Sequence, residues 1–303
     1  MKQPEGFIEA GYEDYVYKLV HTIYGTMQGA HNWYETLAKT YEDLGYITLC
    51  ADPCVRFKKE EENYTLTNTY TDNVFGASNN DEEEEKRKGK IGEIWEMKDV
   101  GQNKYFLGMR VQQDLEQGTI QLTQRPCWEH IINQFNLEHI TPRNTPLPTG
   151  ISLDSNMSPK TESKKQAMND KPYWSILGSV MWGQLATCPD LLFSVSLLTC
   201  FQANPGIKHW NTLTHVMGYI KNTLDYGLTY YHDIDLSPRA FVDADYGGCR
   251  DTQCSTSGYI FLMAGRPVTW SSKCQATVVL STVEVEYIAM FSVHSKWPGC
   301  KVG

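Results

Sequence analysis

The chain has 303 residues, of which 41% are hydrophobic and 21% are charged, and its formal net charge is −9 at pH 7. This length allows two or three domains of about 100 to 200 residues each, and this composition excludes an intrinsically disordered chain. No run approaches the roughly 18 apolar residues of a membrane helix, and the N-terminus lacks a signal-peptide core. We therefore expect an intracellular protein, cytoplasmic or nuclear, with no membrane partner. The negative charge weighs against strong autonomous binding of nucleic acid.

The nine cysteines stand at irregular positions in a chain with no secretory signal, which favours reduced thiols over a disulfide framework. Neither Cys50 with Cys54 nor Cys249 with Cys254 has the spacing of paired zinc ligands, and no suitable histidine pair follows. We expect no structural zinc site.

The N-terminal half alternates helices with short strands. Residues 15–48 predict a strand or loop, a turn at Tyr24-Gly25 and a helix that ends near Gly45. Residues 64–76 predict a β-hairpin with polar residues at its tip, preceded by a short strand at 55–57. The further elements expected here are a charged helix at 82–98, a strand pair at 105–111 and 119–122, and an amphipathic helix at 125–136.

The C-terminal half begins with residues 150–172, which are rich in Ser, Lys, Asp and Pro and predict a linker. Residues 173–227 predict mainly helices, and His209 beside Trp210 indicates a partly buried structural histidine rather than a nucleic-acid contact. The chain then predicts strands at 240–242, 258–263 and 268–270 and a helix from 281 to 290. This order of elements predicts the α+β fold class.

Carboxylates stand near predicted strand ends at two places in the sequence. Asp72 lies at the tip of the first hairpin, and Asp243 and Asp245 end a later strand, with Glu284 and Glu286 further along the chain. Carboxylates in such places can hold a divalent ion, but taken alone each place is more typical of an ordinary surface turn.

The order of several short motifs along the chain is more specific than any one of them. These motifs are Gln3-Pro-Glu-Gly-Phe7, Tyr24-Gly25-Thr-Met-Gln28, Tyr70-Thr-Asp72-Asn73, Lys104-Tyr-Phe-Leu-Gly108, Asp243-Ala-Asp245, Ser255-Thr-Ser-Gly-Tyr259 and Ser281-Thr-Val-Glu-Val-Glu-Tyr287. In this order they resemble the Pol polyprotein of copia-type LTR retrotransposons, from the middle of the reverse transcriptase palm into the start of the ribonuclease H domain. The resemblance covers nearly the whole chain.

The resemblance implies a domain order and an activity. Residues 1–149 are expected to form the C-terminal part of the palm with the thumb, 150–237 a linker and helical connection, and 238–303 an incomplete ribonuclease H-like α/β domain. The family copies RNA or DNA into DNA on a template-primer and cleaves the RNA strand of a hybrid. Both reactions use two divalent ions, Mg²⁺ by resemblance, held roughly 4 Å apart by several carboxylates. Other Pol chains are possible partners.

The resemblance also implies roles for individual residues. The expected metal ligands are Asp72 at the polymerase hairpin, and Asp243 and Glu286 at the nuclease site, with Asp245 and Glu284 as second choices. The expected substrate-binding residues lie in the nucleotide-binding turn and the primer-grip region: Tyr24, Gly25, Gln28, Tyr105, Phe106 and Gly108.

The sequence departs from the family pattern at its catalytic positions. Asn73 stands where the hairpin signature Tyr-x-Asp-Asp has its second Asp, and an amide supplies neutral oxygen in place of charge. The family's first polymerase Asp lies upstream of the Gln3-Pro-Glu-Gly-Phe7 block. Because this block begins two residues after the start of the chain, we expect the first Asp to be missing. After Met290 the sequence loses the expected helical pattern, and the next nuclease Asp is missing. We therefore expect an inactive fragment.

Two other hypotheses about function remain open from the sequence. An active enzyme would require Mg²⁺-dependent primer extension, against which Asn73 weighs. A non-catalytic nucleic-acid-binding module, or a remnant recruited by the host, would require salt-sensitive binding, against which the net charge weighs.

Overall fold

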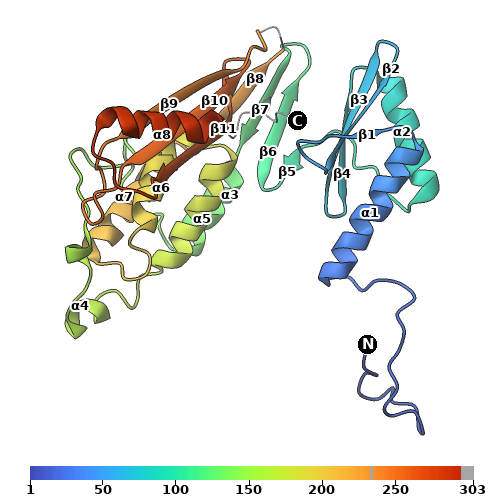
Figure 1. The fold of residues 1–303 in the computed structure, drawn as a ribbon, viewed down its shortest axis with the longest axis horizontal. Helices are drawn as coiled ribbons and strands as arrows, with labels where there is room; N and C mark the ends of the chain where they lie inside the picture. The colour runs from blue at the N-terminus through green and yellow to red at the C-terminus, as the bar shows by residue number, and fades with distance from the viewer. Residues whose placement is uncertain (233–234, 295–303) are drawn as a thin grey trace. The chain divides into compact units, whose positions relative to one another are not determined.

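The computed structural model describes residues 1–232 and 235–294 (Figure 1). The chain divides into two compact units, residues 1–101 and residues 102–303. Among the described residues, three antiparallel sheets combine with helices, so the expectation of a mixed helix-and-sheet protein is confirmed at that level. The boundary expected near residue 149 falls inside the second unit.

Unit 1 begins with an N-terminal segment that makes one β-bridge, between Lys2 and Val16, before helix α1. Helix α1, Met27–Asp43, starts at Thr26, whose hydroxyl oxygen accepts a hydrogen bond from the Gly29 amide at 3.0 Å. The helix ends before Gly45, which has a φ of 83° that glycine adopts without strain. The predicted helix and its C-terminal glycine are confirmed.

The sheet of unit 1 has the strand order β1-β2-β3-β4. Its strands are β1 Ile47–Thr48, β2 Val55–Glu60, β3 Asn63–Tyr70 and β4 Asn73–Ser78, and helix α2, Asp81–Ile94, follows them. Strand β3 buries Thr65, Thr67 and Thr69 and exposes Tyr64 and Leu66, so one face of this sheet is covered. The core under the helices consists of Leu37, Tyr41, Tyr46 and Ile91, with Trp33, Leu44, Val74 and Trp95 packed around them.

Unit 2 builds its first sheet from segments far apart in the sequence. The order is β5-β6-β7-β8, with β5 Tyr105–Phe106, β6 Met109–Asp114, β7 Thr119–Thr123 and β8 Gly227–Tyr231. Gly227 pairs with Thr123, and a Cβ added at Gly227 would overlap the Leu122 carbonyl oxygen. The glycine therefore lets β8 approach β7 closely.

The helices of unit 2 enclose its main apolar core. They are α3 Arg125–Gln134, α4 Glu162–Gln166, α5 Tyr173–Ala186, α6 Leu192–Thr199 and α7 Ile207–Asn222, with the short 3-10 turns η1 Ser155–Met157 and η2 Pro189–Leu191. The segment 150–172, expected as a linker, contributes to this core, because Leu153 is buried in it and Ile151 and Met157 pack against it.

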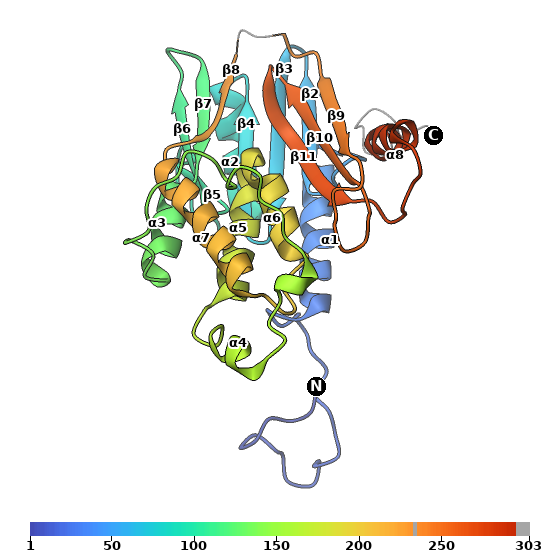
Figure 2. The same ribbon diagram turned by 90° about the vertical axis from the view of Figure 1, so that its left-hand side faces the viewer.

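The last sheet of unit 2 has the order β11-β10-β9, with β9 Arg239–Asp245, β10 Thr256–Met263 and β11 Arg266–Cys274 (Figure 2). Helix α8, Thr282–His294, packs on β9 and β10. The helical pattern was expected to end at Met290, which is wrong: Val285, Ala289 and Val293 recur every four residues and are all buried, so packing continues the helix. The rest of the expected tail, 295–303, lies outside the described residues.

Candidate functional site

The hairpin between β3 and β4 carries the candidate polymerase carboxylate at its tip. Tyr70 pairs with Asn73, so Thr71 and Asp72 form a two-residue turn, as the sequence predicted. Thr71 has a φ of 56°. A β-branched residue in this left-handed region is a conformational outlier, and such strain persists only where surrounding contacts impose it. The turn is therefore held in one shape that fixes where Asp72 projects.

The contact that holds the turn comes from helix α1. The indole Nε1 of Trp33 donates a hydrogen bond to the Thr71 carbonyl oxygen at 2.7 Å. The Trp33 ring in turn packs edge-on against Trp95 just after α2, with 5.1 Å between ring centroids. Trp33 also packs against the apolar core of unit 1, and its second role as an anchor of the turn has no signal in the sequence other than the indole itself.

The chemistry of the turn is that of one carboxylate beside an amide. Asp72 and Asn73 are both exposed, and the Asn73 Nδ2 donates to the Asp72 Oδ1 at 3.5 Å. The amide thus points a hydrogen at the only carboxylate of the turn, where a second acidic group would offer another ligand oxygen. Within residues 1–232 and 235–294, no three His, Cys, Asp or Glu side chains converge to hold a metal ion. These two residues do not fit the two-ion arrangement that the family resemblance implies.

The expected nucleotide-binding residues lie at the N-terminal end of α1. Tyr24 is 88% exposed, Gly25 has a φ of 85°, and Gln28 is exposed in the first helical turn. A Cβ added at Gly29 would lie 2.6 Å from the Ile23 carbonyl oxygen, so this position accepts only glycine without a backbone shift. The motif therefore forms a tight entry into the helix that carries Trp33.

The expected primer-grip residues form a separate hairpin in unit 2. Tyr105 and Phe106 of β5 pair with Arg110 and Met109 of β6, through a turn at Leu107 and Gly108 with φ values of 48° and 79°. Positive φ at both turn positions is the geometry that joins twisted antiparallel strands tightly. The Tyr105 side chain is exposed. This hairpin and the Asp72 turn belong to different units.

One face of the C-terminal sheet is directed toward helix α8. The Gln275 Nε2 donates to the Ser257 Oγ at 2.8 Å and to the Val285 carbonyl oxygen at 3.1 Å, which links β10 to α8. Phe261 lies on the same face of β10 as Ser257 and is buried. Helix α8 thus covers the face that carries Ser257 and Phe261.

Asp243 lies on the opposite face of that sheet. It pairs with Gly258, the neighbour of Ser257, and successive side chains in a strand alternate between faces. Asp243 and Asp245 line an open cavity of about 600 Å³ that also touches Phe193 of α6. Glu286, half-buried, arises from α8 in the other layer. The sharing of one ion by Asp243 and Glu286 stays a prediction, and the layer arrangement weighs against it.

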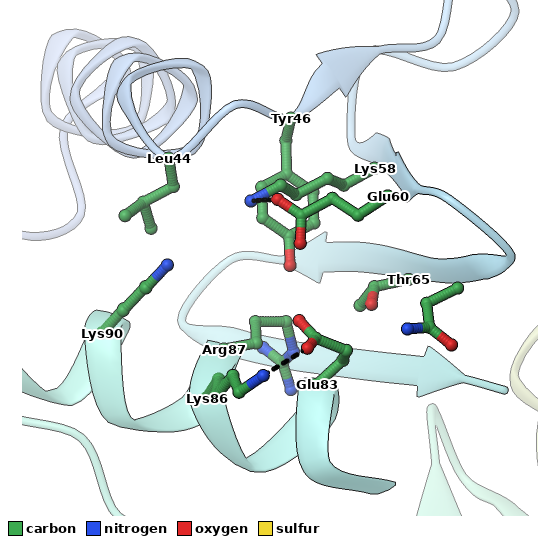
Figure 3. Close-up of a pocket in the computed structure, with 10 residues that line it drawn as sticks. Leu44, Tyr46, Lys58, Glu60, Thr65, Glu83, Lys86, Arg87 and Lys90 are labelled. Carbon is green, nitrogen blue, oxygen red and sulfur yellow. Dashed lines mark hydrogen bonds and ion pairs between the residues drawn. The ribbon is translucent and has the colours of Figure 1, made fainter. Parts of the chain in front are cut away.

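A charged hollow between α2 and the sheet of unit 1 was not expected from the sequence (Figure 3). Two of its lining lysines are paired with acids: Lys58 lies 2.8 Å from Glu60, and Lys86 lies 2.5 Å from Glu83. The volume of about 20 Å³ admits about one water molecule. Burial is the main cause that raises the pKa of Tyr46 in this hollow to about 12. Because the hollow has so little room, and because acids lie beside Lys58 and Lys86, it is a structural feature rather than a phosphate site.

Comparison with known proteins assigns the chain to a family. Residues 1–149 match the family model of reverse transcriptase (RNA-dependent DNA polymerase). The chain is 33% identical over 290 residues to the retrovirus-related Pol polyprotein from transposon TNT 1-94 of Nicotiana tabacum, an alignment that covers 95% of this chain and 22% of the relative. The chain belongs to the copia-type retrotransposon Pol family. The predicted family is thereby confirmed.

Two further relatives extend across the same region of this Pol family. The Pol polyprotein from transposon RE2 of Arabidopsis thaliana is 28% identical over 296 residues, which cover 98% of this chain and 20% of the relative. The putative transposon Ty5-1 protein of Saccharomyces cerevisiae is 29% identical over 295 residues, which cover 95% of this chain and 92% of the relative. The chain thus spans about a fifth of the length of the plant Pol polyproteins that it matches.

No solved structure matches the chain. Across the residues that the structure describes, every helix is too short or too polar to cross a membrane.

Proposed function

We propose that this chain is the palm-to-nuclease region of a Pol polyprotein whose activity is RNA-directed DNA synthesis on a template-primer, coupled to cleavage of hybrid RNA. The observation that carries the proposal is the strained β3–β4 turn, which presents Asp72 at the position of the polymerase hairpin signature. In this proposal residues 1–149 are palm and thumb, 150–237 are the connection, and 238–303 are the ribonuclease H-like part. The β9–β11 sheet followed by α8 supports the last assignment.

The residues on the substrate side take two places in this proposal. Tyr24, Gly25 and Gln28 line the nucleotide-binding side at the start of α1 in this proposal, because the first backbone amides of a helix lack acceptors within the helix and can bind an anion. Tyr105, Phe106 and Gly108 support the primer through the β5–β6 turn. The exposed Tyr105 ring offers a face on which a sugar or base can stack.

We further propose that this chain does not catalyse polymerisation by itself. Asn73 leaves Asp72 as the one carboxylate of the turn, and its amide donates a hydrogen bond to that carboxylate. Two-ion chemistry needs several charged oxygen ligands to neutralise the developing charge, and a neutral amide contributes little affinity for a hard cation. The nuclease part is proposed to be inactive as well, because Asp243 and Glu286 arise from different layers of the fold.

The test is the substitution Asn73→Asp. A second carboxylate at the turn should bind Mn²⁺ more tightly, seen as paramagnetic broadening of the amide signals of residues 70–74. Primer extension with Mg²⁺ should stay undetectable, because among the described residues no third His, Cys, Asp or Glu side chain converges with Asp72 and residue 73 to complete a two-ion site. The matched control is Asn169→Asp, which adds the same charge at an exposed asparagine of unit 2 and should leave the turn unaffected. Primer extension by the unsubstituted chain or by Asn73→Asp would overturn the inactivity. If Asn73→Asp leaves the Mn²⁺ broadening at residues 70–74 the same as in the unsubstituted chain, the turn is not a metal-binding position.

A further inference from the structure

Four cysteines of unit 2 gather around the segment between β9 and β10. Cys249 and Cys254 lie in that segment, Cys200 follows α6, and Cys274 ends β11. The spacing of Cys249 and Cys254 in the sequence does not indicate a zinc pair, and nothing in the sequence connects them with Cys200 or Cys274. In the fold, Cys254, Cys249 and Cys200 all contribute to raising the pKa of the Cys274 thiol, which places them within electrostatic range of it.

The backbone closes the segment between Cys249 and Cys254 into a tight loop. The Cys249 amide donates to the Cys254 carbonyl oxygen at 3.1 Å, and the Gln253 amide donates to the Cys249 carbonyl oxygen at 2.8 Å. Gln253 has a φ of 57°, a left-handed conformation that turns the chain sharply before Cys254. The loop thus delivers Cys254 to the start of β10.

The β10–β11 ladder then sets Cys254 beside Cys274. Thr256 pairs with Cys274, and the Gln275 amide continues the ladder by donating to the Ser255 carbonyl oxygen at 2.8 Å. Cys254 precedes Thr256 by two residues, so alternation puts both on the face of Cys274, and Cys254 becomes the diagonal neighbour of Cys274.

The chemical state of the pair suits a reversible reaction. Both are free thiols; Cys274 is exposed and Cys254 is half-buried, so small reagents can reach them. Although the residue is exposed, partial desolvation of its thiol, and then the neighbouring Cys254, Cys249 and Cys200, raise the pKa of Cys274 to about 11. Cys274 therefore remains protonated at neutral pH, which suits it to be the second cysteine to react in a thiol–disulfide exchange.

We propose that Cys254 and Cys274 form a thiol-disulfide site that is oxidised by low-molecular-weight disulfides. The Cys254 thiolate attacks one sulfur of the small disulfide, the sulfur–sulfur bond breaks, and one small thiol leaves with a proton from solvent. Cys274 then gives up its proton and attacks the Cys254 sulfur, which releases the second small thiol. Two protein thiols are oxidised to one disulfide, and one small disulfide is reduced to two thiols.

The disulfide would restrain a segment next to the candidate nuclease carboxylates. Asp245 and Thr256, at either end of this segment, line the open cavity beside Asp243. Within the segment, Asp251 accepts hydrogen bonds from the Ser155 amide at 2.9 Å and the Ser155 hydroxyl at 2.7 Å. A disulfide between Cys254 and Cys274 would therefore tie the segment at the edge of the cavity to β11, in addition to the contact between Asp251 and Ser155.

The experiment treats the reduced full chain with oxidised glutathione and maps the products by mass spectrometry of non-reduced peptides. The expected product is a peptide linked through Cys254 and Cys274, with a mass lower by about 2 Da than the two free peptides. Cys274→Ser should remove this product, whereas Cys54→Ser, a matched change in unit 1, should leave its yield unchanged.

Differential alkylation of the unsubstituted chain before and after oxidation keeps the test independent of the folding of any variant. Loss of alkylation at Cys254 and Cys274 together supports the proposal. A linkage that mainly involves Cys249 or Cys200 would overturn it, and so would glutathione that stays attached to Cys254 with Cys274 still alkylated.

Discussion

Two glycines of α5 allow a matched test of the helical core of unit 2. A Cβ added at Gly183 would overlap the six-membered ring of Trp128 in α3, with the Cζ3 atom 2.9 Å away. The Trp128 side chain is 2% exposed and has no room to move aside. A Cβ added at Gly178 of the same helix meets nothing within 4 Å. Both positions therefore change helix propensity alike, and only Gly183 changes the packing.

The expected magnitudes follow from these two contributions. Replacing glycine by alanine inside a helix favours folding by about 1 kcal/mol, so Gly178→Ala should stabilise unit 2 by about that amount. Inserting a methyl group into a filled core costs about 1 to 3 kcal/mol, so Gly183→Ala should be neutral to destabilising by about 2 kcal/mol once the helix gain is subtracted. The difference between the two variants equals the cost of the overlap.

The assay is urea unfolding of both variants and the unsubstituted chain, with hydrogen exchange of α3 and α5 to assign the change to unit 2. The midpoint should rise for Gly178→Ala and should not rise for Gly183→Ala. An equal rise for both would refute the contact between Gly183 and Trp128 and with it the position of α3 on α5. A fall for both would refute the separation of propensity from packing.

Two further predictions concern unit 1. Trp33→Phe keeps an aromatic ring but removes the donor to the Thr71 carbonyl oxygen. The loss should cost about 0.5 to 1.5 kcal/mol of stability and speed hydrogen exchange at residues 70–74. The control is Trp174→Phe, at an exposed tryptophan of unit 2, and unchanged exchange in Trp33→Phe would contradict the role of Trp33 as an anchor. Burial raises the pKa of folded Tyr46 to about 12, above the ordinary value of about 10. Between pH 10 and pH 12 the Tyr46 hydroxyl therefore ionises in the unfolded chain but not in the folded one. The contribution of Tyr46 to stability is complete below pH 10 and is lost as the pH rises from 10 to 12. Tyr46→Phe should flatten this decline in alkaline unfolding curves, and an equally steep decline in that variant would assign the effect to another group.

The sequence by itself determined several of the local elements and the family. The β3–β4 hairpin, the helix that ends before Gly45 and the structural role of His209 all follow from patterns within a few residues. His209 is fully buried, its Nδ1 accepts from the Gly206 amide at 2.9 Å, and burial lowers its pKa. These features were predictable because turn chemistry, helix caps and apolar periodicity are written in neighbouring residues.

The tertiary structure alone decided which distant segments meet. Nothing local to Gly227 names Thr123 as its partner, yet the pairing builds β8 onto β7 and joins the two sides of the expected boundary at 149. Likewise, the two residues of the candidate nuclease pair, Asp243 and Glu286, were matched by their order along the chain, whereas strand register and the packing of α8 put them in different layers. Register fixes which face of a sheet each side chain occupies, and it is set by long-range pairing that a single sequence does not record.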